Sequence, residues 1–500
     1  MPDKKHTLRL KRLGIDTYKE AVIYMHTDCH ICRSEGFEAQ ARIQITLGDN
    51  SIMATLNTVD TDLLDVEEAS LSNYAWELLK AHERDIITLS HPKLLGSVAY
   101  IRSKIYGNAL KKDEMAAVIK DVTTGYLSDV HIATFLTACA GGRLDKQEIL
   151  YLTEAMLQVG DTLTWNSPIV VDKHSIGGLP GNRTSLIIVP IVTAFGLTMP
   201  KTSSRAITSP AGTADTMEVF APVELDIAAM RKVVEAENGC IVWGGLSLSP
   251  ADDIIIRIER AMDIDSEGQV VASILSKKIA SGSTHIVLDI PIGPTAKVRT
   301  PQMAQMLKNG FESVCQEFGI KLHISFSNGL QPIGRGIGPA LEAKDILAVL
   351  RCEKNAPQDL RDKSLTLAGQ VLEFSPRVLP GTGKQLATTL LDSGQAWKKF
   401  QAICQAQGGM FEPPTAFHQH VVTASISGHV RSIDNRRLAR VAKLAGAPRS
   451  KAAGVELLTP LGSIIEKDQP LFIIHAETAG ELRYTVDYFE QEHTIIQLEP

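Results

Sequence analysis

The chain has 500 residues, of which 44% are hydrophobic and 22% are charged, and its formal net charge is -6. A chain of this length is too long to fold around one compact hydrophobic core, so we expect two to four structural units. The composition is that of an ordinary globular protein. The acidic balance argues against a nucleic-acid partner, and the longest apolar run, residues 186–199, is shorter than the roughly 20 residues of a membrane span. Seven scattered cysteines, and a basic N-terminus with no apolar run behind it, predict a reducing cytoplasmic location rather than secretion.

Alternating apolar residues between positions 38 and 60 predict a β-hairpin in a small β-rich N-terminal domain. The apolar faces consist of Ala41, Ile43, Ile45 and Leu47 before a Gly-Asp-Asn turn and of Ile52, Ala54 and Leu56 after it. Cys29 and Cys32 precede this hairpin and lie near His26 in the sequence. A structural zinc site needs four ligands, usually as two separated pairs, and no second pair follows at a fitting distance, so we expect no metal here.

Helical patterns occupy about residues 92–160 and 251–280. Asp145 and Glu148 form a capping box before one helix, and Ser128 is suited to cap another, at residues 130–138. Short apolar runs predict buried strands at residues 168–172, 240–243, 285–290 and 322–326. Helices alternate with these strands, which indicates a mainly parallel sheet, and such sheets bind ligands at the C-terminal ends of their strands.

The helical pattern at residues 251–280 interrupts the α/β region, and a further α/β-like unit begins at about residue 418 and runs to residue 500.

The densest polar cluster, residues 172–185, follows the first predicted strand of the parallel sheet. Its three glycines let backbone N–H groups approach an anion, and the helix that follows adds partial positive charge at its N-terminus. A full charge comes from Lys173, and hydroxyl donors come from Ser175, Thr184 and Ser185. The spacing is not that of a Walker loop. A tight turn with solvated side chains is the alternative, but this residue set favours a phosphate cradle, with His174 as the best acid or hydrogen-bonding candidate.

A second cluster, residues 201–218, combines seven hydroxyl side chains with one Arg and one Lys. This composition suits phosphate and sugar hydroxyls, and it equally suits an ordinary Ser/Thr-rich surface loop. Further along, Ser273 and Lys277 share one helical face, where spacing alone favours a solvent-exposed polar face over recognition of a base. Asp263 and Asp265 interrupt the same helical segment.

The three clusters together resemble the thymidine (pyrimidine-nucleoside) phosphorylase family, especially its longer branch typified by archaeal AMP phosphorylases. The Lys-His-Ser-x-Gly-Gly motif of the family is residues 173–178. Its Ser-x-Arg…Gly-Thr-x-Asp-x-x-Glu motif corresponds to Ser203, Arg205, Gly212, Thr213, Asp215 and Glu218, and its Ser-x-x-x-Lys to Ser273 and Lys277. The similarity extends from about residue 94 to the C-terminus.

The resemblance implies a role for each matching residue. Ligands of the attacking phosphate would be Lys173, Ser175, Ser185, Ser203 and Thr213. Nucleoside or nucleotide contacts would be Gly178, Ser204, Arg205, Ala206, Ile207, Thr208, Ser209, Thr213, Ser273, Lys277 and Lys297. Asp265 matches the proton donor of AMP phosphorylases, and His174 would lie beside the base and assist its departure.

The resemblance also implies an α/β multidomain fold of the nucleoside phosphorylase and phosphoribosyltransferase type. A helical domain, residues 91–163 with 251–282, would lie beside a larger α/β phosphate-binding domain, residues 164–250 with 283–415. A β-rich N-terminal domain at 1–90 and an α+β C-terminal domain at 416–500 would be added. The implied reaction is reversible phosphorolysis of thymidine, or of a nucleotide such as AMP, CMP or UMP, to free base and sugar 1-phosphate. Inorganic phosphate would be a co-substrate, no cofactor or metal is required, and a homodimer or larger homo-oligomer is expected.

One departure from the family bears on specificity. Short nucleoside phosphorylases contact the base with an Arg whose position here, counting back from Ser273, is Ile258. Arg257 and Arg260 lie nearby in the sequence, and this difference favours the nucleotide branch. Two other classes stay open: a phosphoribosyltransferase similar to anthranilate phosphoribosyltransferase, which would need a diphosphate and magnesium, and a non-catalytic nucleotide-binding protein.

Overall fold

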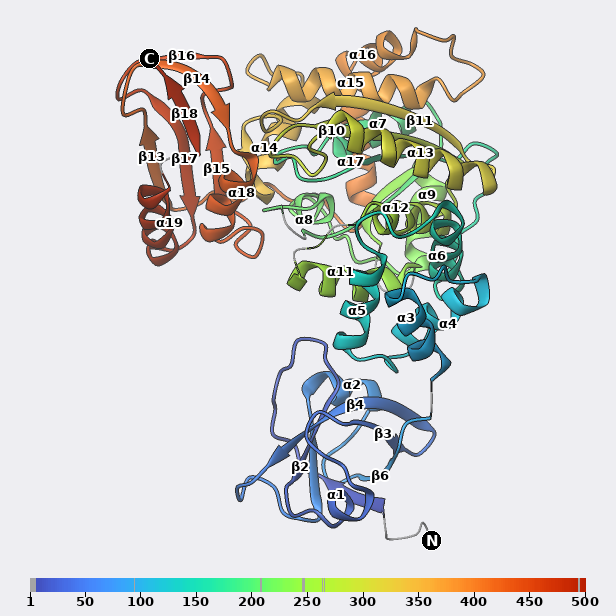
Figure 1. The fold of residues 1–500 in the computed structure, drawn as a ribbon. Helices are drawn as coiled ribbons and strands as arrows, with labels where there is room; N and C mark the ends of the chain where they lie inside the picture. The colour runs from blue at the N-terminus through green and yellow to red at the C-terminus, as the bar shows by residue number, and fades with distance from the viewer. Residues whose placement is uncertain are drawn as a thin grey trace. The chain divides into compact units, whose positions relative to one another are not determined.

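The computed structural model describes residues 6–93, 95–206, 209–244, 248–262, 264, 266–492 and 495–500. The chain divides into two compact units, Met1–Ala138 and Cys139–Pro500 (Figure 1). Within the described ranges, no helix is both long and apolar enough to cross a membrane.

The first unit begins with a closed barrel of six strands in the order β1-β5-β2-β4-β3-β6. The strands are β1 (Thr7–Leu10), β2 (Val22–His26), β3 (Arg42–Leu47), β4 (Asn50–Val59), β5 (Glu68–Leu71) and β6 (Ile86–Ser90). The predicted hairpin is confirmed, since β3 and β4 pair antiparallel with Ile43 opposite Ala54 and Ile45 opposite Ile52. Ile43, Ile45 and Ala54 are fully buried, as the alternating pattern requires.

The first unit also contains the helices α1 (His30–Glu35), α2 (Asn73–Leu79), α3 (Gly96–Ile105) and α4 (Lys112–Thr123). Helix α5 (Asp129–Cys139) ends at the first residue of the second unit. Cys29 is the N-cap of α1 and Cys32 lies in its first turn, and both are buried in the barrel core. The predicted cap of α5 is confirmed, since the backbone N–H of His131 donates to Ser128 Oγ at 3.4 Å.

The second unit contains the predicted parallel sheet. Its strands are β7 (Val171–Ser175), β8 (Met199–Ser203), β9 (Gly239–Trp243), β10 (His285–Ile292) and β11 (Lys321–Asn328). The orders β11-β10-β7 and β8-β9 are parallel throughout, and a parallel bridge between Val170 and Thr198 joins the two groups. The prediction of parallel strands is therefore confirmed, and β7, β9 and β10 are buried as expected. Burial was wrong for the run at 322–326, because β11 lies at the edge of its sheet and none of its residues is buried.

The predicted end of the first parallel strand was wrong. We expected the strand to stop at Asp172, where polar residues begin, but β7 continues to Ser175 because its backbone keeps pairing with β10 as far as Asp289. Asp172 and Lys173 are consequently strand residues, and their exposed fractions are only 0% and 1%. The charged residues mark the buried end of a strand and not the start of a solvated loop.

The second unit also contains the helices that pack around this sheet. They are α6 (Lys146–Gln158), α7 (Ser185–Ala194), α8 (Thr213–Met217), α9 (Ile227–Glu237), α11 (Pro250–Met262), α12 (Glu267–Ala280), α13 (Pro301–Glu317), α14 (Pro339–Leu350), α15 (Gln358–Leu372), α16 (Gly383–Asp392) and α17 (Gln395–Ala406). Figure 1 draws α15 and α16 on one side of β10 and β11, with α12 on the other. The long apolar run is explained by α7, which packs against α15 and α17 in the central core.

Two further helix predictions are confirmed. The Asp145–Glu148 capping box begins α6, with the Glu148 N–H donating to Asp145 Oδ1 at 2.8 Å. The helical segment predicted at 251–280 consists of α11 and α12, and α12 packs on α6, far earlier in the chain. Asp263 and Asp265, between α11 and α12, lie outside the described residues.

The C-terminal part of this unit is α+β, with antiparallel sheets in the orders β12-β15-β17-β13 and β16-β14-β18. Its elements are β12 (Gly336–Ile337), β13 (His418–Thr423), β14 (Gly428–Ile433), α18 (Asn435–Leu444), β15 (Gly454–Leu457), β16 (Ile464–Ile465), β17 (Pro470–Ala476), α19 (Ala479–Gln491) and β18 (Ile496–Glu499). The short strand β12 comes from the central segment and pairs with β15, so the C-terminal sheet is anchored to the chain that precedes α14.

The central core gives a stability prediction. Phe400 on α17 is fully buried and packs edge-on against Phe220, with ring centroids 5.2 Å apart. Phe400→Ala leaves a cavity and should lower the free energy of unfolding of this unit by about 3–5 kcal/mol. Denaturant unfolding followed by tryptophan fluorescence measures the change. Phe417→Ala, at a side chain 90% exposed, is the control and should change stability by less than about 0.5 kcal/mol; equal midpoints for both variants would contradict the assignment of the core.

Candidate active site

A cavity of about 270 Å³ lies at the C-terminal ends of β7 and β8. Its walls come from the segments after these two strands, from α11 and α12, and from Lys297 after β10. The sequence-predicted residues that line it are Lys173, His174, Ser175, Gly178, Ser185, Ser203, Ser204, Arg205, Ser209, Thr213, Ser273, Lys277 and Lys297. Ala206 does not line this cavity, and Ile207, Thr208 and Asp265 lie outside the described residues. The three clusters of the sequence thus meet at one place.

The segment between β7 and α7 holds its polar side chains in fixed hydrogen bonds. Lys173 Nζ donates to Thr184 Oγ1 at 2.7 Å. Ser175 Oγ donates to Asp289 Oδ2 at 2.6 Å and accepts from Asn182 Nδ2 at 2.9 Å. Because Asp289 belongs to the neighbouring strand β10, the sheet itself orients a hydroxyl that faces the cavity.

Two glycines in this segment are required by close backbone approaches. Gly178 has φ +92°, and a Cβ there would lie 2.6 Å from the Lys297 backbone nitrogen. Gly181 has φ +71°, and a Cβ would lie 2.1 Å from the Ile333 carbonyl oxygen. No other residue type fits either position without moving the backbone. Gly178 therefore lets the Lys297 backbone lie against the segment between β7 and α7, and Gly181 does the same for Ile333.

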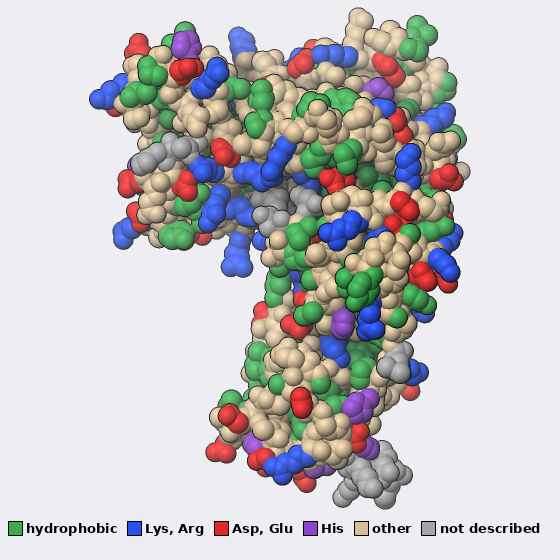
Figure 2. All heavy atoms as spheres, in the orientation of Figure 1, with side chains coloured by type: hydrophobic (Ala, Val, Ile, Leu, Met, Phe, Trp, Pro, Cys, Tyr) green, Lys and Arg blue, Asp and Glu red, His purple; other side chains and the backbone are tan. Residues whose placement is uncertain are grey.

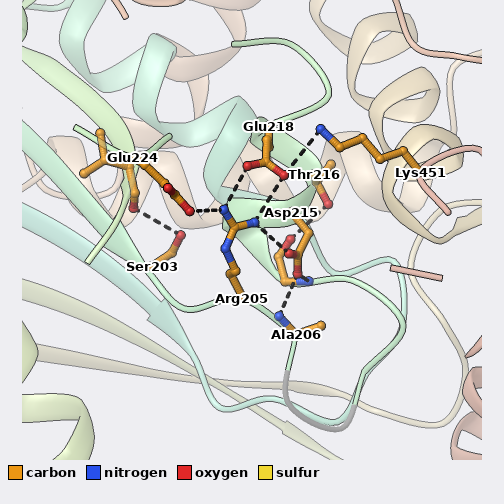
Figure 3. Close-up of polar contacts among 10 residues, drawn as sticks. Ser203, Arg205, Ala206, Asp215, Thr216, Glu218, Glu224 and Lys451 are labelled. Atoms are coloured by element: carbon orange, nitrogen blue, oxygen red, sulfur yellow. Dashed lines mark hydrogen bonds and ion pairs between the residues drawn. The ribbon is translucent and has the colours of Figure 1, made fainter. Parts of the chain in front are cut away.

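The segment between β8 and α8 is organised by Arg205 (Figure 3). Its guanidinium contacts three carboxylates: Glu218 at 2.8 Å, Glu224 at 2.7 Å and Asp215 at 3.3 Å. It also lies over the Trp243 ring, 5.3 Å from the centroid. These partners raise the pKa of Arg205, the hydrogen bond to Glu218 being the largest cause. Arg205 lines the cavity, but its charge is already compensated by protein groups.

The carboxylate of Asp215 holds the two ends of the same segment together by hydrogen bonds. Its Oδ2 accepts from the backbone N–H of Ala206 at 2.6 Å and from that of Gly212 at 2.7 Å. One carboxylate therefore joins the two ends of the stretch 206–212, as Figure 3 shows for Ala206. Ser209 and Thr213, which line the cavity, are placed by this closure.

The wall formed by α12 carries the predicted base contacts. Lys277 Nζ donates to Ser273 Oγ at 3.1 Å and forms an ion pair with Asp252 of α11. Ile258 is buried and does not line the cavity, whereas Arg260 of the same helix α11 does. The position at which the short phosphorylases carry an Arg therefore faces the protein interior.

Sequence analysis missed a set of buried charges below the cavity. Asp172 is fully buried between Lys201 and Lys278, and Asp289 pairs with Lys363 at 3.0 Å. A local signal existed only for Asp172, Lys201 and Asp289, which are charged residues inside apolar strands, whereas Lys278 and Lys363 lie on helices. The Asp172–Lys278 pair joins residues more than a hundred positions apart, which no local pattern contains.

Burial controls the charge of two cavity residues. Desolvation, reinforced by Lys278 and Lys201, holds the pKa of His174 well below its ordinary value. Desolvation also lowers the pKa of Lys173 to about 7, although Asp289 opposes that shift. At neutral pH His174 is therefore an uncharged imidazole, suited to hydrogen bonding with a neutral or developing anionic partner and not to acting as a strong acid.

Comparisons with known proteins agree with this geometry. Residues 98–160 match the helical bundle domain of a glycosyl transferase family, and residues 167–397 match its a/b domain. Anthranilate phosphoribosyltransferase from Thermus thermophilus has a similar fold, with TM-score 0.52 and 18% identity over 62% of this chain and 99% of that one. The fold and domain pair define a glycosyl transferase of the pentosyl or phosphoribosyl class.

Relatives similar along their whole length identify the family. The chain is 60% identical over 494 residues to "Putative thymidine phosphorylase" of Legionella pneumophila (strain Paris), covering 99% of this chain and 96% of that protein. It is 56% identical over 496 residues to a protein of the same name from Polaromonas sp. (strain JS666 / ATCC BAA-500), covering 99% and 97%. The chain belongs to the thymidine phosphorylase family.

The closure by Asp215 gives a prediction that needs no substrate. Asp215→Ala removes the charged acceptor of two backbone N–H groups, each bond to a charged group contributing about 1.5–3 kcal/mol. Amide hydrogen exchange, measured by mass spectrometry, should become at least about tenfold faster at Ala206 and Gly212.

The matched control is Asp226→Ala. Asp226 caps α9 by accepting from the Ala229 N–H at 2.7 Å, away from the cavity. This control should accelerate exchange only near Ala229. Unchanged exchange at Ala206 and Gly212 in Asp215→Ala would show that the segment is held by other contacts.

Proposed function

We propose that the protein catalyses reversible phosphorolysis of the glycosidic bond of a nucleoside 5′-monophosphate, giving free base and sugar 1-phosphate. The observation that carries the proposal is the convergence of two residue sets on one cavity. A set rich in hydroxyl and cationic donors comes from the ends of β7 and β8, and the pair Ser273 and Lys277 comes from α12. Such a cavity suits a reaction between an inorganic anion and a base-bearing sugar.

On the phosphate side, the proposed ligands are Lys173, Ser175, Ser185, Ser203 and Thr213, all of which line the cavity. Lys173 supplies charge, and its Nζ is already held by Thr184 Oγ1 at 2.7 Å. Ser175 donates its single hydroxyl proton to Asp289, so this hydroxyl has to rotate before it donates to the anion. A cation already held in place, such as Lys173, needs little reorganisation when the anion binds.

In the proposed reaction a phosphate oxygen bonds to the anomeric carbon while the glycosidic carbon–nitrogen bond breaks. The electron pair of that bond passes to the base, and the bound phosphate stabilises the cationic sugar that forms between them. The proton taken up by the departing base is assigned, from the family resemblance, to Asp265. Neutral His174 would donate a hydrogen bond to the base as negative charge develops on it.

A second anion subsite is proposed for the 5′-phosphate. Arg183, Lys201 and Arg205 are poor candidates because carboxylates already compensate each of them. Arg260 and Lys297 line the cavity, and α18 adds basic residues close by, since Arg260 and Arg440 both contribute to the lowered pKa of Lys443, after burial. Figure 2 shows Lys and Arg side chains gathered on the side of the C-terminal sheets where Figure 1 labels α18. This positive field supports a nucleotide as substrate.

Thymidine is the second candidate substrate. The names of the relatives from Legionella and Polaromonas support it. The buried position of Ile258 speaks for a different base contact from the Arg of the short nucleoside phosphorylases. The assay below discriminates between the two candidates and also tests the phosphoribosyltransferase alternative.

The purified protein is incubated with phosphate and, separately, AMP, CMP, UMP, thymidine and uridine, and free base is followed by chromatography. We expect phosphate-dependent base release from the monophosphates, unaffected by a magnesium chelator. Lys173→Met should lower the rate at least about a hundredfold by removing a buried charge aimed at the anion. Release from thymidine alone would favour the second candidate, and magnesium-dependent use of a sugar diphosphate would overturn phosphorolysis.

The lowered pKa of Lys173 predicts a pH dependence. The ammonium is mostly charged below pH 7 and mostly neutral above it, because its pKa is about 7. The KM for phosphate, corrected for the ionisation of phosphate itself, should therefore be constant below pH 6 and rise roughly tenfold per unit above pH 7. Steady-state kinetics from pH 5.5 to 9 test this, with the KM of the nucleotide as internal control. A phosphate KM that stays flat to pH 9 would mean that Lys173 keeps its proton or does not bind phosphate.

A further inference from the structure

A buried triad of Asp172, Lys201 and Lys278 lies at the floor of the cavity. Lys278 Nζ is 2.7 Å from Asp172 Oδ2, and Lys201 Nζ is 3.1 Å from Asp172 Oδ1. Both ammonium groups also donate to the Thr202 carbonyl oxygen, at 3.2 and 3.1 Å. The three side chains are at most 3% exposed. The triad therefore ties β7, β8 and α12 together through nearly buried charged groups, of which Lys201 and Lys278 border the cavity.

Each strand residue that the triad holds is next to a proposed phosphate ligand. Asp172 precedes Lys173, and Thr202 precedes Ser203. Lys278 follows Lys277 on α12, whose side chain faces Ser273. A shift of the triad would move the phosphate side and the base side of the cavity relative to each other.

The charges of the triad do not balance. Two lysines, Lys201 and Lys278, share one carboxylate, that of Asp172. With both lysines protonated, the triad carries one excess positive charge at a nearly buried place, an unfavourable arrangement for stability unless an anion compensates it.

We propose that the Asp172–Lys201–Lys278 triad is a positioning element of the phosphate subsite, whose excess buried positive charge is neutralised when inorganic phosphate binds as a dianion. The proposal rests on the proposed function only in taking phosphate as the anion. Lys278 and Lys201 act through Asp172 and Thr202, which fix the strand ends that carry Lys173 and Ser203. Their charge adds to the field that attracts the anion.

The protonation behaviour of the lysines agrees with this assignment. Burial lowers the pKa of both Lys173 and Lys278 to about 7. A dianion nearby restores the charged forms, so phosphate binding above pH 7 should take up protons. The other titratable or charged groups around the triad are His174 on β7, Cys240 on β9, and Lys277 with its partner Asp252.

The test measures binding of inorganic phosphate alone, by isothermal titration calorimetry at pH 8 in two buffers of different ionisation enthalpy. We expect wild type to take up protons on binding. Lys278→Met should weaken phosphate binding roughly tenfold or more, as removal of one unit charge a few ångströms away requires, and should reduce proton uptake. Its thermal midpoint should not fall, because Asp172 and Lys201 remain as a neutral pair. In turnover assays the phosphate KM should rise more than kcat falls.

Lys399→Met is the matched control, because Lys399 also forms a partly buried ion pair, with Glu237 at 2.8 Å, but does not line the cavity. It should bind phosphate within twofold of wild type. Lys201→Met is the second variant if Lys278→Met does not fold, and it should weaken phosphate binding in the same way. Phosphate affinity within twofold of wild type in either folded triad variant overturns the proposal, as does failure of wild type to bind phosphate.

The phosphate-binding test and the base-release assay together distinguish failure of the triad proposal from failure of the proposed phosphorolysis. If no base is released from any nucleotide but phosphate binds and Lys278→Met weakens it, the triad proposal stands and phosphorolysis falls. If base is released and Lys278→Met binds phosphate like wild type, phosphorolysis stands and the triad proposal falls.

Discussion

The ion cluster of Asp172 with Lys201 and Lys278 is the constraint on which the rest of the site depends. Asp172 is fully buried on a central strand, where an unpaired carboxylate would cost several kcal/mol. Lys201 from β8 and Lys278 from α12 supply the opposite charge, and the contact of Lys278 ties α12 to this strand. The cavity exists between these elements because the charges below it allow few other arrangements.

Carboxylates position the cation and hydroxyl donors of the cavity. Asp289 orients Ser175, and Asp215 joins the ends of the segment after β8 while Arg205 is held by Asp215, Glu218 and Glu224. Lys451, from the C-terminal part of the chain, also contacts Glu218, at 3.3 Å. An anion site built in this way uses negative groups as anchors one layer behind positive and neutral groups, so these side chains border the cavity in fixed positions.

The sequence predicted the parts of this structure that depend on local signals. The hairpin at Ile43 and Ile45, the capping box at Asp145 and the parallel strands follow from periodicity and capping chemistry within a few residues. Most of the residues named from the family motifs line one cavity, but Ala206 does not, and Ile207, Thr208 and Asp265 lie outside the described residues. Local patterns failed at β7, where strand pairing with β10 carries the strand through Asp172 and Lys173 despite their polarity. The Asp172–Lys278 pair and the carboxylates around Arg205 depend on tertiary contacts that a single sequence does not display.

Helix α12 explains how one element serves two sides of the cavity. Successive residues of an α-helix point about 100° apart, so Lys277 and Lys278 face different neighbours. Lys277 meets Ser273 and Asp252 on the side proposed for the base, whereas Lys278 reaches the buried Asp172 below the phosphate side. The distance between the two sides is thus set by the geometry of one rigid helix. A reaction in which phosphate replaces a base at one sugar carbon requires such a fixed separation, because attacking and leaving groups must lie in line across that carbon.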